Sequence, residues 1–391
     1  MRKLTRVIAA LACALLLISA SFPALAVNTS DYNTHDVEKL RAFFLLQGGA
    51  GVSNGRAIIG DTFDENDPST WTCCEWTSGG RLLSISFSSL GWNVSGTLDL
   101  AGCTALNSVS ATDCYITGID VTGCSALTRL VLTGDRVSEI DVTTNPELDL
   151  LWFKQNSVSS LDLSNNHKLR SLDCSFNNIS ELDVTGCPML VTLRCTNNSI
   201  ESIDVSNCPL LTELNIKVNR LTELDISSLT SLSRFFSFGN LLTQLDVSVM
   251  NGGVSYVIKA VGNGYIGTKC FTNELGEPVI HGSSEAAEGE EFLGWYVSGQ
   301  LISTDEHIPC LFGQGPIVME ALFSGGAPSL QMGDVNGDGL VNTTDALMML
   351  RYTVGQISAS ELHLEVGDMN ADGLYNSTDA LIIMRIAFGI M

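Results

Sequence analysis

The sequence is poor in charge, and especially in positive charge. Charged residues make up 16% of the 391 residues, and 20 Lys and Arg stand against 43 Asp and Glu, which gives a formal net charge of −23. Nucleic acids and anionic membrane surfaces bind proteins through clustered positive charge. We therefore expect no nucleic acid among the partners of this chain.

Long apolar runs are also missing, except at the N-terminus. There, basic Arg2 and Lys3 precede an apolar run over about residues 7–18, and the small-residue sequence Ala24-Leu25-Ala26 follows. The run is too short to span a bilayer, and the order of these features is that of a secretory signal peptide. We predict that residues 1–26 are a signal peptide, and that the protein is secreted, to an extracellular or cell-surface complex, without membrane insertion. Cys13 leaves a lipid anchor as the alternative.

Residues arranged for catalysis are the third thing that the sequence lacks. Its five His are scattered and show no metal-ligand spacing or catalytic pairing. Gly51–Gly55 fits Gly-x-Ser-x-Gly without the strand and helix that a nucleophile elbow needs. Gly262–Gly267 fits a dinucleotide fingerprint but opens no helix. We therefore predict no catalytic residues and a protein that is not an enzyme.

What the sequence does contain is a repeat of 21 residues. A Leu/Ile-Asp-apolar motif begins at Leu98 and returns at the same interval at Ile119, Ile140, Leu161, Leu182, Ile203, Leu224 and Leu245. Taking this first residue as position 0, apolar residues recur at positions 8, 11 and 18. Five repeats have Asn at position 16, namely Asn156, Asn177, Asn198, Asn219 and Asn240. A fixed period of this length indicates a solenoid, in which each turn adds a short strand to a parallel sheet and needs its neighbours to bury its apolar face. We expect the Asn amides to bond backbone groups in the bends.

The pattern Leu-x-x-Leu-x-Leu/Cys-x-x-Asn-x-Ile closely resembles the leucine-rich repeat over residues 98–249. The resemblance implies a leucine-rich-repeat solenoid with a parallel sheet. Residues 27–97 resemble the N-terminal cap of such proteins, with Trp71 and Trp76 around Cys73-Cys74 and helical spacing over residues 34–47. A cap would shield the open end of the repeat core.

The cysteines follow the repeat rather than a disulfide pattern. Twelve are present, eleven of them beyond residue 26, and cysteines of an exported chain usually form disulfides. Six of them, however, occupy fixed positions of the repeat, where Asn or apolar residues stand in other turns: Cys103, Cys124, Cys174, Cys187, Cys195 and Cys208. We predict that these six are buried free thiols. The Asp at position 1 of all eight repeats is expected to accept backbone N–H groups in the next turn, with a calcium ladder as the alternative.

Positions 10, 12 and 14 of the repeat face outward on the concave side of the sheet. In this acidic chain these positions gather basic and aromatic residues, which are typical of recognition surfaces. We predict a face that binds a protein or a glycan, formed by Arg129, Trp152, Lys154, Arg194, Lys217, Arg234, Phe236 and Phe238. The alternative for Phe236 and Phe238 is that they cover the end of the coil.

Residues 250–323 alternate apolar and polar residues with a period of two, which predicts a small β domain. Phe292-Leu-Gly-Trp295-Tyr, Gly299 and the closing EALF sequence resemble a divergent internalin-type B repeat, a module that usually acts as a spacer. Residues 324–330 are predicted to be a linker.

The last part of the chain contains the same acidic loop twice. Residues 333–355 and 367–389 agree at 13 of 23 positions. Each copy places oxygen-bearing side chains at positions 1, 3, 5, 9 and 12, Gly at position 6 and a backbone carbonyl at position 7, which is the spacing that surrounds one calcium ion. We predict two Ca²⁺ ions, held by Asp334, Asn336, Asp338, Leu340, Asn342 and Asp345 and by Asp368, Asn370, Asp372, Leu374, Asn376 and Asp379.

Two departures from an ordinary EF-hand, Asp at position 12 and no clear helix before Asp334, match the type I dockerin, which residues 331–391 resemble. The resemblance implies an all-α calcium-binding domain that docks onto a cohesin domain of a scaffoldin. It also implies the contacts with cohesin, at Thr343, Thr344, Leu350, Arg351, Ser377, Thr378, Met384 and Arg385. Because the two faces are nearly identical, docking in either of two orientations is expected.

Each acidic loop is followed by a helix of about two turns, which is too short to be stable alone. We expect the two helices to bury Leu347 against Leu381 and to need calcium to fold. For Leu350 and Met384, core packing is the alternative to a cohesin contact.

These features predict a multidomain protein that is secreted, non-catalytic and anchored through a Ca²⁺-dependent dockerin in a cellulosome-like polysaccharide-degrading complex. A cell-surface adhesin, or an inhibitor or assembly factor of the complex, is the alternative. A polysaccharide hydrolase subunit is disfavoured, because no acid/base pair of carboxylates is evident.

Overall fold

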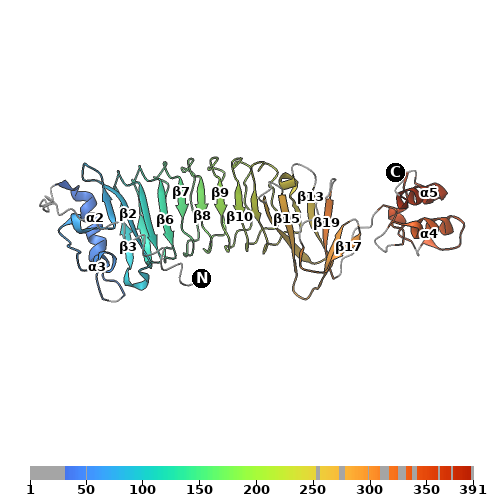
Figure 1. Cartoon of the computed structure of the whole chain (residues 1–391), viewed down its shortest axis with the longest axis horizontal. Helices are drawn as coiled ribbons and strands as arrows, with labels where there is room; N and C mark the ends of the chain where they lie inside the picture. The colour runs from blue at the N-terminus through green and yellow to red at the C-terminus, as the bar shows by residue number, and fades with distance from the viewer. Residues whose placement is uncertain are drawn as a thin grey trace, which may run out of the picture.

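The computed structural model describes residues 31–49, 51–251, 256–272, 278–297, 299–308, 317–324, 332–336, 341–359, 362–370 and 373–388. The predicted signal peptide and residues 325–330 of the predicted linker lie outside these ranges. The described parts run from a helical cap through a solenoid to a two-sheet β region and a pair of helices (Figure 1). No helix among them is long and apolar enough to cross a bilayer.

The cap closes the first turn of the solenoid. It contains α2 (Thr34–Leu45), α3 (Asn54–Ile59), the 3₁₀ helices η2 (Pro68–Thr70) and η3 (Gly91–Asn93), and strands β1 (Cys74–Trp76) and β2 (Leu82–Ser88). α2 begins after Asn33, whose side chain accepts a hydrogen bond from the N–H of Asp36. Its inner face buries Leu40 and Phe44, and the Phe44 ring meets Trp71 edge-on at 5.1 Å. β2 then starts the parallel sheet, while β1 pairs antiparallel along its outer edge.

The predicted solenoid is confirmed by the strand register. Its concave sheet continues from β2 through β4 (Ser108–Thr112), β6 (Arg129–Thr133), β7 (Leu150–Trp152), β8 (Ser171–Asp173), β9 (Thr192–Arg194), β10 (Glu213–Asn215) and β11 (Arg234–Phe236). Each strand is parallel to the one before, and from β6 on each is displaced by one repeat, so that Leu172 lies beside Leu193 and Leu193 beside Leu214. These side chains are fully buried. On the opposite side, β3 (Gly96–Asp99) pairs in parallel with β5 (Ile116–Asp120).

The asparagines at position 16 bind the turns together as expected. Asn177 donates through Nδ2 to the carbonyl groups of Phe153 and Cys174, both at 3.0 Å, and its Oδ1 accepts the N–H of Val158 at 3.0 Å. The same pattern recurs at the other four. Each buried hydrogen bond adds about 1 kcal/mol, so the column ties every turn to the one before it.

The structure also confirms the two other predicted columns. All six repeat cysteines are buried free thiols. The Asp at position 1 accepts the N–H of the residue two places on in every repeat, at Asp99, Asp120, Asp141, Asp162, Asp183, Asp204, Asp225 and Asp246. At Asp183, bonds from the hydroxyl and the N–H of Thr185 lower the pKa of the carboxyl.

The region after the repeats contains the predicted strands, and one of its two sheets continues the concave sheet of the solenoid. Its strands are β12 (Gln244–Asp246), β13 (Tyr256–Val261), β14 (Gly264–Thr272), β15 (Pro278–Ala286), β16 (Phe292–Val297), β17 (Gln300–Ser303), β18 (His307–Ile308) and β19 (Ile317–Phe323), and a 3₁₀ helix, η4 (Ser248–Asn251), follows β12. β14 pairs antiparallel with β11, which extends the concave sheet through β15 to β18. The second sheet has the order β12-β13-β19-β16-β17. Trp295 and Phe323 belong to the same buried core as the repeats. The boundary at residue 250 and the likeness to a B repeat stay predictions.

The C-terminal part has its own small core. α4 (Thr343–Thr353) and α5 (Ser377–Ala387) pack together, with the 3₁₀ helix η6 (Leu364–Val366) between them in sequence (Figure 1). Each helix has 11 residues, about three turns rather than the two expected. The core contains Ala346, Met349, Ala380 and Ile383, together with Val335 and Leu362.

The predicted contact between Leu347 and Leu381 is wrong. Their side chains are 54% and 60% exposed. The cause is the helical phase: Ala346 and Met349 define the buried stripe, and a residue at 347 is turned about 100° away from 346.

Candidate recognition face and calcium loops

The outward positions of the concave sheet line up in rows across the strands. Trp152 is half-buried and donates through Nε1 to the hydroxyl of Ser171 at 2.9 Å. The ammonium group of Lys217 lies 5.1 Å from the ring centre of Phe238 and 5.7 Å from that of Phe236. Such cation–π contacts hold rings and cations together on the surface, so the predicted residues form neighbouring groups.

Two of the predicted cations are already paired. Glu213, only 7% exposed, accepts from Arg194 at 2.6 Å and lies 3.1 Å from Arg234. The hydrogen bonds from Arg194, with the charge of Arg234, hold the pKa of Glu213 below its ordinary value. Arg129, Lys154 and Lys217 make no ion pair within 4.0 Å in the described part of the chain. The positive charge offered by this face is therefore smaller than the sequence indicates.

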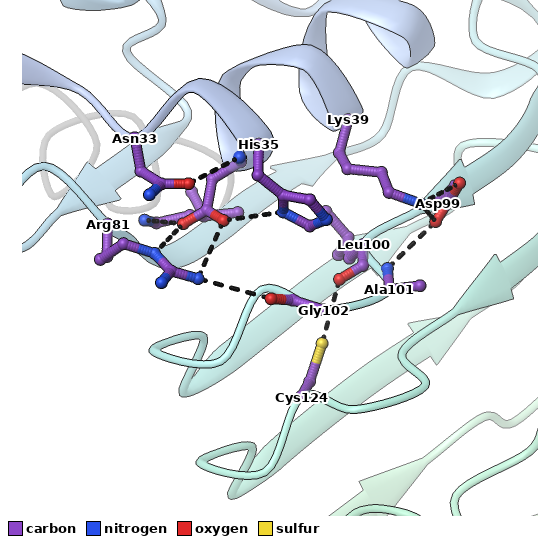
Figure 2. Close-up of polar contacts among 11 residues, drawn as sticks. Asn33, His35, Lys39, Arg81, Asp99, Leu100, Ala101, Gly102 and Cys124 are labelled. Carbon is purple, nitrogen blue, oxygen red and sulfur yellow. Dashed lines mark hydrogen bonds and ion pairs between the residues drawn. The ribbon is translucent and has the colours of Figure 1, made fainter. Parts of the chain in front are cut away.

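A polar cluster joins the cap to the first turn (Figure 2). The buried carboxylate of Asp36 accepts from Arg81 Nε at 2.8 Å and from the N–H of Leu82 at 2.9 Å, and it lies 3.2 Å from His35 Nδ1. Burial would raise the pKa of Asp36, but the bonds from Arg81 and Leu82 outweigh it and lower the pKa. Although His35, Asp36 and Cys103 lie close enough for a metal ion, these bonds occupy the carboxylate. We interpret the cluster as structural.

The first acidic loop closes on the carboxyl group of Asp345. This side chain is buried at the start of α4, where its Oδ2 accepts the N–H of Asn342 at 2.9 Å and its Oδ1 accepts the N–H of Asn336 at 3.2 Å. Asn342 caps the helix by accepting the N–H of Thr344 at 2.7 Å. One carboxyl group thus holds both ends of the loop.

The second loop repeats this arrangement. Asp379 is buried and accepts the N–H groups of Asn376 and Met369, both at 2.9 Å. Gly373 has φ = 77° at the sixth position and donates its N–H to Asp368 at 2.9 Å. That left-handed conformation favours glycine. Asp338, Leu340 and Asp372 lie outside the described residues.

The donors in the described parts of these loops fit calcium. Asp334 and Asp345 come from one loop and are both fully buried. Burying two carboxylates in one short loop is costly unless a cation compensates them. The side-chain donors of both loops are oxygen atoms, the ligands that calcium prefers.

Comparison with known protein families identifies the family of the C-terminal segment. Residues 332–386 match the dockerin type I domain. This segment is a type I dockerin. Domains of this type bind calcium, and a dockerin implies a cohesin domain as its partner.

Several solved structures are similar to part of this chain. They include the functional domain of InlJ from Listeria monocytogenes, described as including a cysteine ladder (26% identity, TM-score 0.26), a leucine-rich-repeat protein of Leptospira interrogans (19%, 0.31) and an internalin, InlF, of Listeria monocytogenes (21%, 0.33). The matches cover 42%, 36% and 44% of this chain and 48%, 45% and 58% of those chains, respectively. No curated protein matches the chain.

Most of the predicted cohesin contacts of the dockerin are exposed. Thr343, Thr344, Leu350 and Arg351 lie on α4 or at its start, and Ser377, Thr378 and Arg385 lie at the same places of α5. Met384 is half-buried and packs against the small core.

Leu347 and Leu381, which the sequence assigned to the core, lie on the same helix faces as the predicted cohesin contacts. Leu347 is four residues after Thr343 and four before Arg351, so it shares their helix face. Leu381 holds the same relation to Ser377 and Arg385. The helical periodicity predicts this placement, because the residues on the face opposite the buried Ala346 and Met349 must be exposed.

Proposed function

We propose that this chain is a non-catalytic recognition protein that its dockerin attaches to a cohesin-bearing scaffoldin. In this proposal the dockerin binds two calcium ions, one in each loop, and the complex is of the polysaccharide-degrading, cellulosome-like kind. The observation that carries the proposal is a dockerin attached to a solenoid whose outward rows gather Trp152, Lys217, Phe236 and Phe238.

The division of labour follows from the two cores. The repeats and the β region share one buried core, whereas the dockerin has another. A rigid sheet presents the recognition face, because side chains on paired strands have little freedom to move. The dockerin then supplies attachment without altering that face. Calcium, when bound, would supply positive charge to the buried carboxylates of the loops.

The proposed location is extracellular, with residues 1–26 removed as a signal peptide. A cell-surface adhesin or an inhibitor or assembly factor of the complex would use the same concave face, and differ in its ligand. A hydrolase subunit is the remaining candidate. Dockerins and leucine-rich repeats are non-catalytic module types.

The experiment that tests the proposal captures ligands with the full chain. The protein is offered plant polysaccharides and secreted proteins, and both retention and soluble product are measured. Retention without product is expected. It should fall for Trp152→Ala combined with Lys217→Gln and persist for Lys168→Gln, which alters a lysine in the repeats that is outside the three rows. Release of new oligosaccharide ends, or equal retention by both variants, would overturn the proposal.

A further inference from the structure

A trough crosses the concave sheet where the repeats meet the β region. Phe238, on the solenoid side, lies next to Gly267, since a Cβ added at Gly267 would be 2.4 Å from the Cα of Phe238. Gly267 pairs with Ser283, and Ser283 pairs with His307. One strand spacing is about 4.8 Å, so two small residues separate two ring-bearing side chains by about 14 Å.

The two small residues leave room above the sheet. A hollow of about 260 Å³ and a second of about 320 Å³ open there, and Phe238, Ser283 and His307 line both. The larger hollow lies within the range of about 300–1,000 Å³ that small-ligand sites occupy, and the smaller one is just below it. The trough is thus walled by a phenyl ring and an imidazole ring and has a hydroxyl group on its floor.

The two ends of the trough differ in charge. Lys269 and His281 line one hollow, and Glu285 and Glu306 line the other. Burial and the charge of Lys269 lower the pKa of His281. Lys269 itself is exposed and lies 5.5 Å from the ring centre of Phe271. The fixed positive charge at this end is therefore the ammonium group of Lys269.

We propose that the trough binds a sugar acid unit of an acidic polysaccharide. The pyranose ring packs against Phe238, its carboxylate pairs with Lys269, and its hydroxyl groups donate to Glu285 and Glu306. This inference rests on the proposed role of the concave face in recognition, and it names the ligand class and the place on that face.

The chemistry of the trough favours a sugar acid over an acidic peptide. β11, β14 and β15 beneath the trough each pair with a strand on both sides, so an extended peptide finds no free edge on these three strands. A sugar acid offers one carboxylate, several hydroxyl donors and a flat apolar ring face. These match one ammonium group, two carboxylate acceptors and one aromatic wall. In a chain with a formal net charge of −23, an anionic ligand needs such a local cation.

The test is isothermal titration of the full chain with galacturonate oligosaccharides, cello-oligosaccharides and a short poly-glutamate peptide. We expect binding of the galacturonate oligosaccharides alone. Loss of one charge-assisted contact should weaken it about tenfold in Lys269→Gln, and Ser283→Phe should abolish it by filling the floor. Lys168→Gln, which alters a lysine of the repeats outside the three rows of the concave face, is the matched control and should bind as the unaltered chain does. The circular dichroism of each variant, measured alongside, reports whether the sheets that carry the trough are intact.

Three results would overturn the inference. Equal weakening by Lys269→Gln and Lys168→Gln would show general charge attraction without a site. Binding of cello-oligosaccharide or poly-glutamate, with no binding of galacturonate, would refute the sugar acid and leave the proposed recognition function standing. Galacturonate binding that Ser283→Phe and Lys269→Gln leave unchanged would place the ligand elsewhere on the chain. The proposed function fails separately, when the capture experiment finds no ligand that depends on Trp152 and Lys217.

Discussion

The carboxyl group of Asp135 accepts a hydrogen bond from the backbone N–H of Cys114 at 3.1 Å. Asp135 stands at position 16 of its repeat, the place that Asn156 takes in the next one. Asn156 donates through Nδ2 to the carbonyl groups of Leu132 and Phe153. Asp135 is only 7% exposed, and its Oδ2 has no hydrogen-bond partner among the described residues. A proton on Oδ2 would let it donate as the asparagines do, and burial raises its pKa to about 6.

We predict that Asp135→Asn stabilises the protein at neutral pH. In the unfolded chain the carboxyl titrates near 3.8, and in the folded chain near 6. The unfolded state therefore loses its proton first as the pH rises, and folding loses about 2–3 kcal/mol between pH 4 and pH 6. Asparagine does not titrate, so the gain should be present at pH 7.5 and small below pH 4. Urea unfolding of both proteins at pH 4 and pH 7.5 measures it, and a gain that does not change with pH would contradict the explanation.

Val218 should be replaceable with a gain in stability. Its φ is 53°, and the equivalent residues of the adjacent turns are Asn197 at 57° and Gly239 at 70°. A β-branched residue is strained in this left-handed region, at a cost of about 1–2 kcal/mol. Val218 is also 44% exposed and so loses little burial. Val218→Asn should raise the free energy of unfolding by about 1 kcal/mol, and the reciprocal Asn197→Val should lower it. If both variants change the free energy of unfolding in the same direction, backbone strain at Val218 is not the cause.

The repeat cysteines should resist modification in the folded protein. Burial raises the pKa of Cys187 to about 12 and that of Cys208 to about 11, and alkylation needs the thiolate. Mass spectrometry after iodoacetamide treatment at pH 8 should find these two unmodified before denaturation and fully modified after it. Cys73, which is half-buried, serves as the comparison. A disulfide at any of the six repeat positions would refute the assignment.

Leu347 and Leu381 should serve docking and contribute little to folding. Both are exposed on the stripe of predicted cohesin contacts. The double substitution Leu347→Asp with Leu381→Asp should weaken cohesin binding at least tenfold while circular dichroism and calcium binding stay unchanged. Each single change should be tolerated, because the other face can still dock. Met349→Asp is the contrasting variant, and it should unfold the dockerin because Met349 is buried in the small core. If Leu347→Asp alone unfolds the dockerin, Leu347 would have to be packed in its core, as the sequence predicted, and the exposed placement would be contradicted.

The repeat made much of the fold predictable. Because the interval is fixed, residues at the same position of successive repeats make the same contacts. The contacts of Asn177, Asp183 and Cys187 therefore predict those of the equivalent residues in the other turns. The raised pKa of Asp135 was not predictable, because Asp replaces the Asn of the other repeats at this position. Its effect depends on carbonyl groups that come near its side chain only in the folded bend. The helical phase of the dockerin was misjudged at Leu347 because two neighbouring apolar residues, Ala346 and Leu347, compete for one buried position.

Contacts outside the repeat could not be derived from the spacing. β14 runs antiparallel to β11, and nothing in either strand shows from sequence that the two pair. The trough depends on that pairing, since it brings Gly267 and Ser283 between Phe238 and His307. The pairing of Arg194 and Arg234 with Glu213 was also missed, although the three lie in adjacent repeats at positions 10 and 12. The number of charged residues at each repeat position does not show that the buried Glu213 forms ion pairs with both arginines.

Calorimetric titration of calcium into the calcium-free full chain tests the central claim most directly. If the C-terminal segment is a dockerin that folds around its ions, each chain should bind two calcium ions, with a rise in helix content. The variant carrying Asp345→Ala and Asp379→Ala should bind none. Absence of calcium binding by the unaltered chain, or two ions still bound by that variant, would contradict the account.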